Sequence, residues 1–264
     1  PESGIAVGNA CSQVNDIAGY GYAGGRCRAA SRPGKLADTM NASIEFSRQG
    51  FVILPRVVPA ADCESLAEKL ATSVRNRTGS RRLLERAWCR ELGNELRRQP
   101  ELHQLLPAES VVVQCSYFAK SGERDWLVAF HQDLSIAVKA IVADTSFTGW
   151  SQKEGVRFVQ PPVALLRQLV AVRVHLDDSN ADNGALRVIP GSHKKGRLTP
   201  EQIRTQRQEF RETLCVAPQG SVLAMRPLLL HASSKQTVAS PRRVLHFVFG
   251  PPSLPAGLQW HEAV

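Results

Sequence analysis

The stretch Phe130-His131-Gln132-Asp133-Leu134 sets the strongest condition on this fold when it is taken together with His231, a hundred residues later. Side chains alternate along an extended backbone, so His131 and Asp133 point to the same side and can reach one ion. His231 can join them only if a distant segment folds back beside the first. Two imidazoles and one carboxylate leave the opposite face of a metal open, which suits a non-haem Fe(II) centre that activates dioxygen.

His-x-Asp alone is a weak signal, because most chance occurrences lie in surface turns or cores. In this sequence, however, further elements accompany the His-x-Asp motif. Ser233 follows His231 by two residues, and Arg242 follows it by eleven and precedes the apolar run 244–249. Between the two halves, the segment 183–193 begins with Asn-Gly and ends in Pro-Gly-Ser-His. The combination of these elements, in this order, carries the inference.

With these residues the sequence resembles the phytanoyl-CoA dioxygenase family of iron- and 2-oxoglutarate-dependent oxygenases, over about residues 44 to 260. The resemblance implies Fe(II) at His131, Asp133 and His231, with 2-oxoglutarate and O2 as cosubstrates. It implies hydroxylation of a C–H bond with release of succinate and CO2. Asp133 is retained, whereas the halogenases of the wider group replace this acid with a small residue.

The distal carboxylate of 2-oxoglutarate needs a fixed cation, and a guanidinium matches carboxylate geometry. Arg242 with Ser233 fits that need, and the resemblance adds Lys120 as a further charge. Gln132 would hydrogen-bond near the cosubstrate or hold the metal-binding turn. Arg243 should point the opposite way on a strand, which makes it a natural control.

Three residues are candidates for substrate binding: Gln114, Arg173 and Trp150. Arg173 lies in a strand predicted over 169–176, on the face shared by Leu169, Ala171 and His175, and needs a partner if it is buried. That partner is either a substrate or cosubstrate carboxylate or one of the acids Asp177, Asp178 and Glu154.

Residues 140–162 show no clear period and are expected to form a lid over the site or a disordered insert, with Trp150 among the apolar residues that favour a lid. His193 is expected to lie outside the metal shell, in a turn. His246 is expected to be a core histidine. The aromatic and acidic residues that mark ectoine hydroxylases after His-x-Asp are missing, which argues against ectoine as substrate.

The composition is that of an ordinary globular protein, and 264 residues suffice for one large β domain with helices packed on it. The net charge of +9 is scattered, which favours solubility or an anionic small-molecule substrate over nucleic acid. No apolar run is long enough to span a membrane. Six dispersed cysteines without a Cys-x-x-Cys motif indicate reduced thiols and a cytoplasmic location.

Residues 1–39, rich in Gly, Ala, Ser and Arg, are expected to be flexible. One hypothesis is that this segment is non-native and that Met40 is the natural start of a domain over 40–264. Helices are predicted over 59–74, with Asp62 as cap, and near 82–92. Strands are predicted from Val111 onward. A capping box at Thr199 predicts the start of a helix that extends to about residue 212. The predicted fold is an all-β core with flanking helices, a double-stranded β-helix or jelly roll.

Three functions fit the sequence. The first is an oxygenase acting on a small, carboxylated metabolite or acyl conjugate. The second is a cupin-like metalloenzyme that uses no 2-oxoglutarate and therefore has no need of Arg242. The third is a non-catalytic jelly-roll binding module, in which the three ligands are coincidental. No pattern predicts the oligomeric state.

Overall fold

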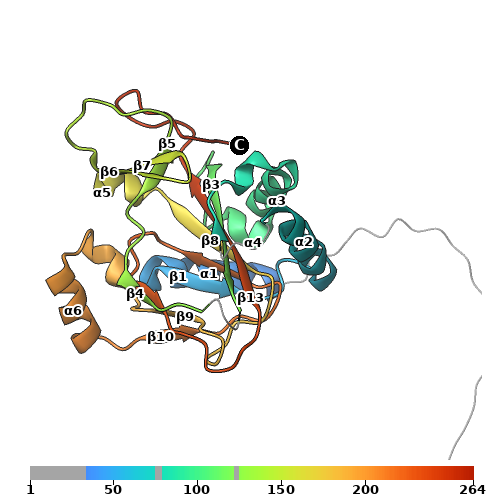
Figure 1. Cartoon of the computed structure of the whole chain (residues 1–264). Coiled ribbons are helices and arrows are strands. Elements are labelled where there is room, and N and C mark those ends of the chain that lie inside the picture. Colours follow the sequence, from blue (N-terminus) through green and yellow to red (C-terminus); the bar gives the residue numbers. More distant parts are fainter. Residues whose placement is uncertain (1–33, 75–78, 122–124) are drawn as a thin grey trace, which may run out of the picture. The chain divides into compact units, whose positions relative to one another are not determined.

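The computed structural model describes residues 34–74, 79–121 and 125–264 (Figure 1). The expectation for residues 1–33, together with Cys11 and Cys27, lies outside the described residues. The predicted boundary between residues 39 and 40 falls inside the first helix, α1 (Gly34–Gln49). The division into domains therefore stays a prediction.

Thirteen strands in the described part of the chain form three antiparallel sheets. The largest has the order β1 (Phe51–Leu54), β11 (Val222–Met225), β8 (Val170–His175), β13 (Arg242–Gly250), β3 (Val111–Lys120) and β2 (Gly79–Ser80). The second has the order β10 (Thr213–Cys215), β9 (Leu186–Val188), β12 (His231–Ser233) and β4 (Val128–His131). The third has the order β5 (Ile136–Val138), β7 (Val156–Gln160) and β6 (Thr148–Lys153). The predicted jelly-roll architecture is confirmed, with open sheets rather than a closed barrel.

Helices cover one face of the six-stranded sheet: α2 (Ala60–Ser73), α3 (Ala87–Arg98) and α4 (Pro100–His103) (Figure 1). Apolar residues of these helices form one core with the sheet, and its members include Leu66, Leu70, Leu96, Leu102, Val170, Val172 and Val174. The remaining helices are α5 (Val163–Leu166), α6 (Pro200–Glu209) and the short 3-10 helices η1 (Leu83–Glu85) and η2 (Ser192–Lys195).

The side chains of β8 alternate between the two faces of the large sheet, as the sequence predicts. Val170, Val172 and Val174 enter the core under the helices. Arg173 therefore lies on the opposite face, where it lines a pocket. The apolar alternation of this strand thus fixes which face of the sheet is available for chemistry.

Three helix predictions need adjustment. The helix predicted over 59–74 is α2, but its N-cap is Pro59 without a side-chain hydrogen bond, so Asp62 lies in the first turn and is not the cap. The helix predicted near 82–92 is η1 followed by α3, which continues to Arg98. The capping box at Thr199 is confirmed, with both reciprocal hydrogen bonds to Gln202 present, and α6 ends at Glu209.

The prediction that residues 140–162 are a lid loop or a disordered insert is wrong in its structural part, because β6 and β7 form an antiparallel hairpin here. The turn of this hairpin is Glu154-Gly155, with positive φ at both residues. Arg81 pairs with Glu154 at 2.9 Å and ties the turn to the segment after β2. Most of β6 is exposed, so its residues lack the apolar alternation that reveals a strand.

None of the helices in the described ranges combines the length and apolar character needed to cross a membrane. Cys63, Cys89, Cys115 and Cys215 are buried free thiols.

Candidate metal centre

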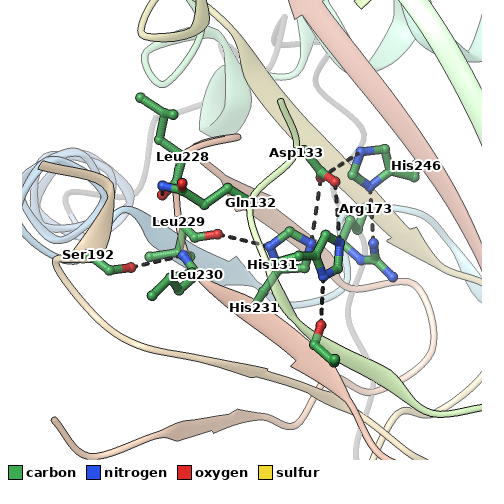
Figure 2. A network of polar contacts seen from close by, with 11 residues as sticks. His131, Gln132, Asp133, Arg173, Ser192, Leu228, Leu229, Leu230, His231 and His246 are labelled. Atoms are coloured by element: carbon green, nitrogen blue, oxygen red, sulfur yellow. Dashed lines mark hydrogen bonds and ion pairs between the residues drawn. The ribbon is translucent and has the colours of Figure 1, made fainter. Parts of the chain in front are cut away.

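The two histidines face each other across a pair of strands. In the antiparallel pairing of β4 with β12, His131 lies directly opposite His231, which is how residues a hundred positions apart reach one site. Asp133 follows β4 and is held in place by its backbone N–H, which donates to Pro227 O at 2.9 Å. Figure 2 shows the three side chains converging.

The carboxylate of Asp133 lies between the two imidazoles. His131 Nε2 is 3.6 Å from Asp133 Oδ1, and His231 Nε2 is 3.6 Å from Asp133 Oδ2. Ligand atoms of the three residues all lie within 4.8 Å of one another. Each Nδ1–H donates to the carbonyl two residues earlier, of Ala129 and Leu229 respectively, at 2.9 Å. Both Nε2 lone pairs are thereby left for a metal.

The charges also suit a divalent cation. Burial opposes ionisation of Asp133, but His231, His131 and His246 together hold its pKa well below the usual range. Burial lowers the pKa of His231 to about 4 despite the attraction of Asp133. The carboxylate is thus anionic and His231 neutral near pH 7, which are the forms that bind metal. The donor set fits a divalent iron centre with open positions.

Gln132 holds the metal-binding turn, which is one of its two predicted roles. Its Nε2 donates to the carbonyls of Gly196 and Leu228 at 2.8 and 2.7 Å. Its Oε1 accepts from the backbone N–H of Leu198 at 2.9 Å. Every polar group of this buried amide is engaged with the backbone, so the strands that carry the ligands are fastened together.

Arg242 is buried and only partly paired. Its Nη2 donates to Ser233 Oγ at 3.4 Å, while Ser233 Oγ donates to Gly184 O at 2.8 Å. Nε and Nη1 of Arg242 have no hydrogen-bond partner. Burial, with repulsion from Arg173, lowers the pKa of Arg242 to about 10, so the group stays cationic near pH 7. A buried guanidinium with free donors is suited to a carboxylate.

Lys120 differs from Arg242 in having partners of its own. It is opposite Arg242 in the pairing of β3 with β13. Its ammonium lies 3.5 Å from Asp125 Oδ1 and donates to the carbonyl of Ser234. Lys120 therefore links segments next to both metal-bearing strands, in addition to lining the pocket beside Arg242.

A pocket of about 370 Å³ lies at these residues, between the large sheet and the strands that carry the histidines. Of the predicted substrate residues, Gln114 and Arg173 line it. Trp150 is not among its lining residues and packs instead against the cluster that includes Phe147 and Trp260. The β6–β7 hairpin contributes Phe158, one of the apolar residues that favoured a lid, and Lys153, which the sequence did not single out.

Arg173 forms none of the three predicted internal ion pairs. Asp177 pairs with Arg243, Glu154 pairs with Arg81, and Asp178 accepts from the backbone N–H of Gln219. Arg173 Nη1 instead donates to His246 Nδ1 at 3.1 Å, and the guanidinium lies over the ring of Phe118. Its Nε is buried without a partner. The guanidinium is thus charged, buried and short of an anion.

Arg243 points away from the pocket, as predicted. Its Nε and Nη2 donate to Asp177 Oδ2 and Oδ1 at 2.8 and 2.6 Å.

Sequence reasoning missed two residues around the centre. Ser192 Oγ donates to Ile189 O at 2.7 Å and accepts from the backbone N–H of Leu230, next to His231. His246 is buried and outside the ligand group, as predicted, but the sequence did not show that it also lines the pocket with Nε2 3.9 Å from Asp133 Oδ2. Its spacing of four residues from Arg242 in a strand was the signal, since it places both on one face. His193, as expected, is outside the ligand group.

Comparison with solved structures shows the fold. The epimerase SnoN from nogalamycin biosynthesis, in complex with Fe3+, alpha ketoglutarate and nogalamycin RO, has TM-score 0.61 and 15% identity, covering 84% of this chain and 92% of that one. AviO1 from Streptomyces viridochromogenes Tue57 has TM-score 0.58 and 22% identity, covering 83% and 97%. HygX from Streptomyces hygroscopicus, with nickel and 2-oxoglutarate bound, has TM-score 0.56 and 18% identity, covering 84% and 88%.

The sequence comparisons give a family. No curated protein matches the chain. The family model described as phytanoyl-CoA dioxygenase matches residues 46–244, which is well over half of the chain and includes all three ligands and Arg242. The chain belongs to the phytanoyl-CoA dioxygenase family.

Proposed function

We propose that the protein is an Fe(II)- and 2-oxoglutarate-dependent oxygenase of the cytoplasm that hydroxylates a C–H bond of a small, carboxylated metabolite or acyl conjugate. O2 is the second cosubstrate, and succinate and CO2 are the coproducts. One observation carries the proposal. A ligand set of His131, Asp133 and His231 shares its pocket with a buried Arg242 that has unpaired donors.

Each residue has a defined task. His131, Asp133 and His231 hold the iron, and Arg242 with Ser233 holds the distal carboxylate of 2-oxoglutarate. When bound, iron and 2-oxoglutarate would supply the activation of dioxygen. Oxidation of the 2-oxo acid to succinate and CO2 provides two of the four electrons that dioxygen accepts, and the substrate C–H bond provides the other two. Gln132 keeps the ligand-bearing turn fixed through its three backbone hydrogen bonds.

The state of Arg242 favours a 2-oxo acid over the cupin-like alternative. Burying a cation without an anion is costly, and that cost persists only where the charge is needed. A metalloenzyme that binds no dicarboxylate would leave Nε and Nη1 of Arg242 unsatisfied throughout its cycle. A binding module without a metal would likewise give no reason for three ligands with free Nε2 and carboxylate atoms in one pocket.

The charge of the pocket supports an anionic substrate. Five cations line it, Arg81, Lys120, Lys153, Arg173 and Arg242, while Asp133 is its one acidic lining residue among those described. Arg81 and Lys120 have acidic partners. Arg173 and Lys153 contact aromatic rings and no acid that the described structure records. Once Arg242 binds 2-oxoglutarate, these two remain for a carboxylate on the substrate.

Hydroxylation is one of several outcomes on this fold, since the structural relatives include an epimerase and a carbocyclase. The test is a screen of anionic candidate substrates for oxygen-dependent succinate release, followed by mass spectrometry of the product. Gain of one oxygen atom is expected. Loss of two hydrogens, or an unchanged mass, would replace hydroxylation by ring closure or epimerisation.

The control for this screen is Asp133→Ala. The variant removes the one anionic ligand, so succinate release should fall to the background of the assay. Turnover that survives this substitution would contradict the assignment of the metal centre.

A further inference from the structure

His246 lies between Arg173, which also lines the pocket, and the metal ligand Asp133. It lies in β13, paired with Arg173 of β8, and is 6% exposed. Nδ1 of its ring accepts from Arg173 Nη1 at 3.1 Å, and Nε2 lies 3.9 Å from Asp133 Oδ2. Figure 2 shows the chain of contacts from the guanidinium through the ring to the carboxylate.

The contact with Arg173 decides where the proton of this imidazole lies. A guanidinium has only donors, so Nδ1 of His246 must accept and cannot carry a hydrogen. In the neutral ring the proton is then on Nε2, the nitrogen that faces Asp133. An imidazolium would carry a hydrogen on Nδ1 as well, so the same contact with Arg173 requires the neutral ring. An N–H dipole is therefore directed at the carboxylate.

Asp133 needs such a restraint on its second oxygen. Its side chain belongs to the turn after β4, and its two oxygens face different histidines. A separation of 3.9 Å is longer than a hydrogen bond, so the contact with His246 is electrostatic. The positive charge of Arg173 behind the ring acts in the same direction, toward the anionic carboxylate.

We propose that Arg173 and His246 form a positioning pair that holds the carboxylate of Asp133 in its metal-binding orientation. His246 is not itself a ligand in this account, because it lies outside the group whose ligand atoms are within 4.8 Å of one another. The inference rests on the proposed metal centre and adds residues that set its affinity. Groups that orient metal ligands in this way commonly contribute about 10- to 100-fold to metal affinity.

The test is the affinity of the full chain for Fe(II), measured anaerobically by competition with a chelator and without 2-oxoglutarate or substrate. His246→Phe keeps the ring volume but removes both nitrogens, and we expect it to bind Fe(II) roughly 10- to 100-fold more weakly. His246→Gln should stay within about threefold of the unsubstituted protein, since the amide can accept from Arg173 and donate toward Asp133. Equal affinity of the Phe and Gln variants would overturn the proposal.

Two further variants keep the result interpretable if His246→Phe does not fold. Arg173→Met leaves the imidazole but removes the donor that fixes its tautomer, so Fe(II) affinity should again fall, and unchanged affinity would count against the pair. His175→Phe is the matched control, because His175 is equally buried and close to Arg173, but neither ring nitrogen has a hydrogen-bond partner. Its Fe(II) affinity should not change.

The outcome separates the pair from the proposed function. If the unsubstituted protein binds no divalent metal, the metal centre itself is wrong and the pair falls with it. If that protein binds Fe(II) and all His246 and Arg173 variants match it, only the positioning role is wrong.

Discussion

Arg242 and Arg243 are adjacent in β13, but their side chains lie in different environments. Strand geometry sends the first into the pocket and the second to the opposite face, where Asp177 neutralises it through two hydrogen bonds. The first is left with unpaired donors beside the metal ligands. A cation of the same type, one residue away, is thus available to separate the loss of charge from the loss of a specific contact.

Gly184 is the residue at which a single methyl group should disturb the carboxylate site. Its φ is +74°, and a Cβ there would lie 2.5 Å from Ser234 O and 3.2 Å from Lys120 Nζ. Its own carbonyl accepts from Ser233. We expect Gly184→Ala to lower the free energy of unfolding by about 1–3 kcal/mol and to weaken 2-oxoglutarate binding. Chemical denaturation and ligand titration measure the two effects.

Gly155→Ala is the control for that experiment. Gly155 also has a positive φ, +80°, but a Cβ there would meet nothing within 4 Å. This variant should lose only about 1 kcal/mol from backbone strain and keep its affinity for 2-oxoglutarate. Equal loss of 2-oxoglutarate affinity in both variants would show that the effect does not depend on the position of Gly184 beside the carboxylate site.

At the scale of elements, the β6–β7 hairpin brings Lys153 to the pocket. If the substrate is anionic, Lys153→Gln should raise its KM roughly tenfold through the loss of one charge-assisted contact, while affinity for 2-oxoglutarate stays the same. Steady-state kinetics with the substrate found by screening provides the measurement. Lys194→Gln, on η2 and lining a different cavity, is the control. An unchanged KM for Lys153→Gln would remove the hairpin from substrate recognition.

The helix α6 is supported by its cap. Thr199 accepts from the backbone N–H of Gln202 and completes a capping box, while Ile203 packs on the cluster behind His231 that includes Leu230. Thr199→Ala should lower the free energy of unfolding by about 1 kcal/mol. Thr205→Ala, within the exposed part of the same helix, should be neutral or slightly stabilising, because alanine is the better helix former. Denaturation curves that rank the two variants in the opposite order would contradict the assigned cap.

Elements with strong local signals could be predicted from the sequence. The alternation in β8 and the capping box of α6 both depend on neighbours in the chain, and both are confirmed. The β6–β7 hairpin was missed because β6 is exposed and polar, with Trp150 as its half-buried residue. The cap of α2 was misplaced because Pro59 ends the preceding segment without any side-chain bond.

For the site, spacing along the chain predicted the ligand group and the opposite directions of Arg242 and Arg243. It could not predict pairing between distant strands, and therefore could not show that Arg173 meets His246 instead of an acid. The link between Ser192 and the backbone next to His231 is of the same kind. These contacts depend on strand register, which no local pattern specifies.

At the scale of the whole molecule, buried histidines make stability depend on pH. Burial, with Arg173 and Arg242 nearby, lowers the pKa of His175 from 6.5 to about 3. Below about pH 6.5 the unfolded chain binds a proton that the folded protein does not, so stability falls as pH decreases toward 3. His175→Leu should therefore lose less stability between about pH 7.5 and about pH 5 than the unsubstituted protein does. Urea unfolding at both pH values tests this, and parallel losses would contradict it.

The central claim is that one pocket holds both iron and 2-oxoglutarate, with Arg242 as the carboxylate anchor. The most direct measurement is anaerobic addition of Fe(II) and 2-oxoglutarate while the weak visible metal-to-ligand charge-transfer band is recorded, for the unsubstituted protein, Arg242→Met and Arg243→Met. The account predicts the band in the unsubstituted protein and in Arg243→Met, and a higher 2-oxoglutarate requirement in Arg242→Met. Iron binding without any band would contradict it and favour the cupin-like alternative.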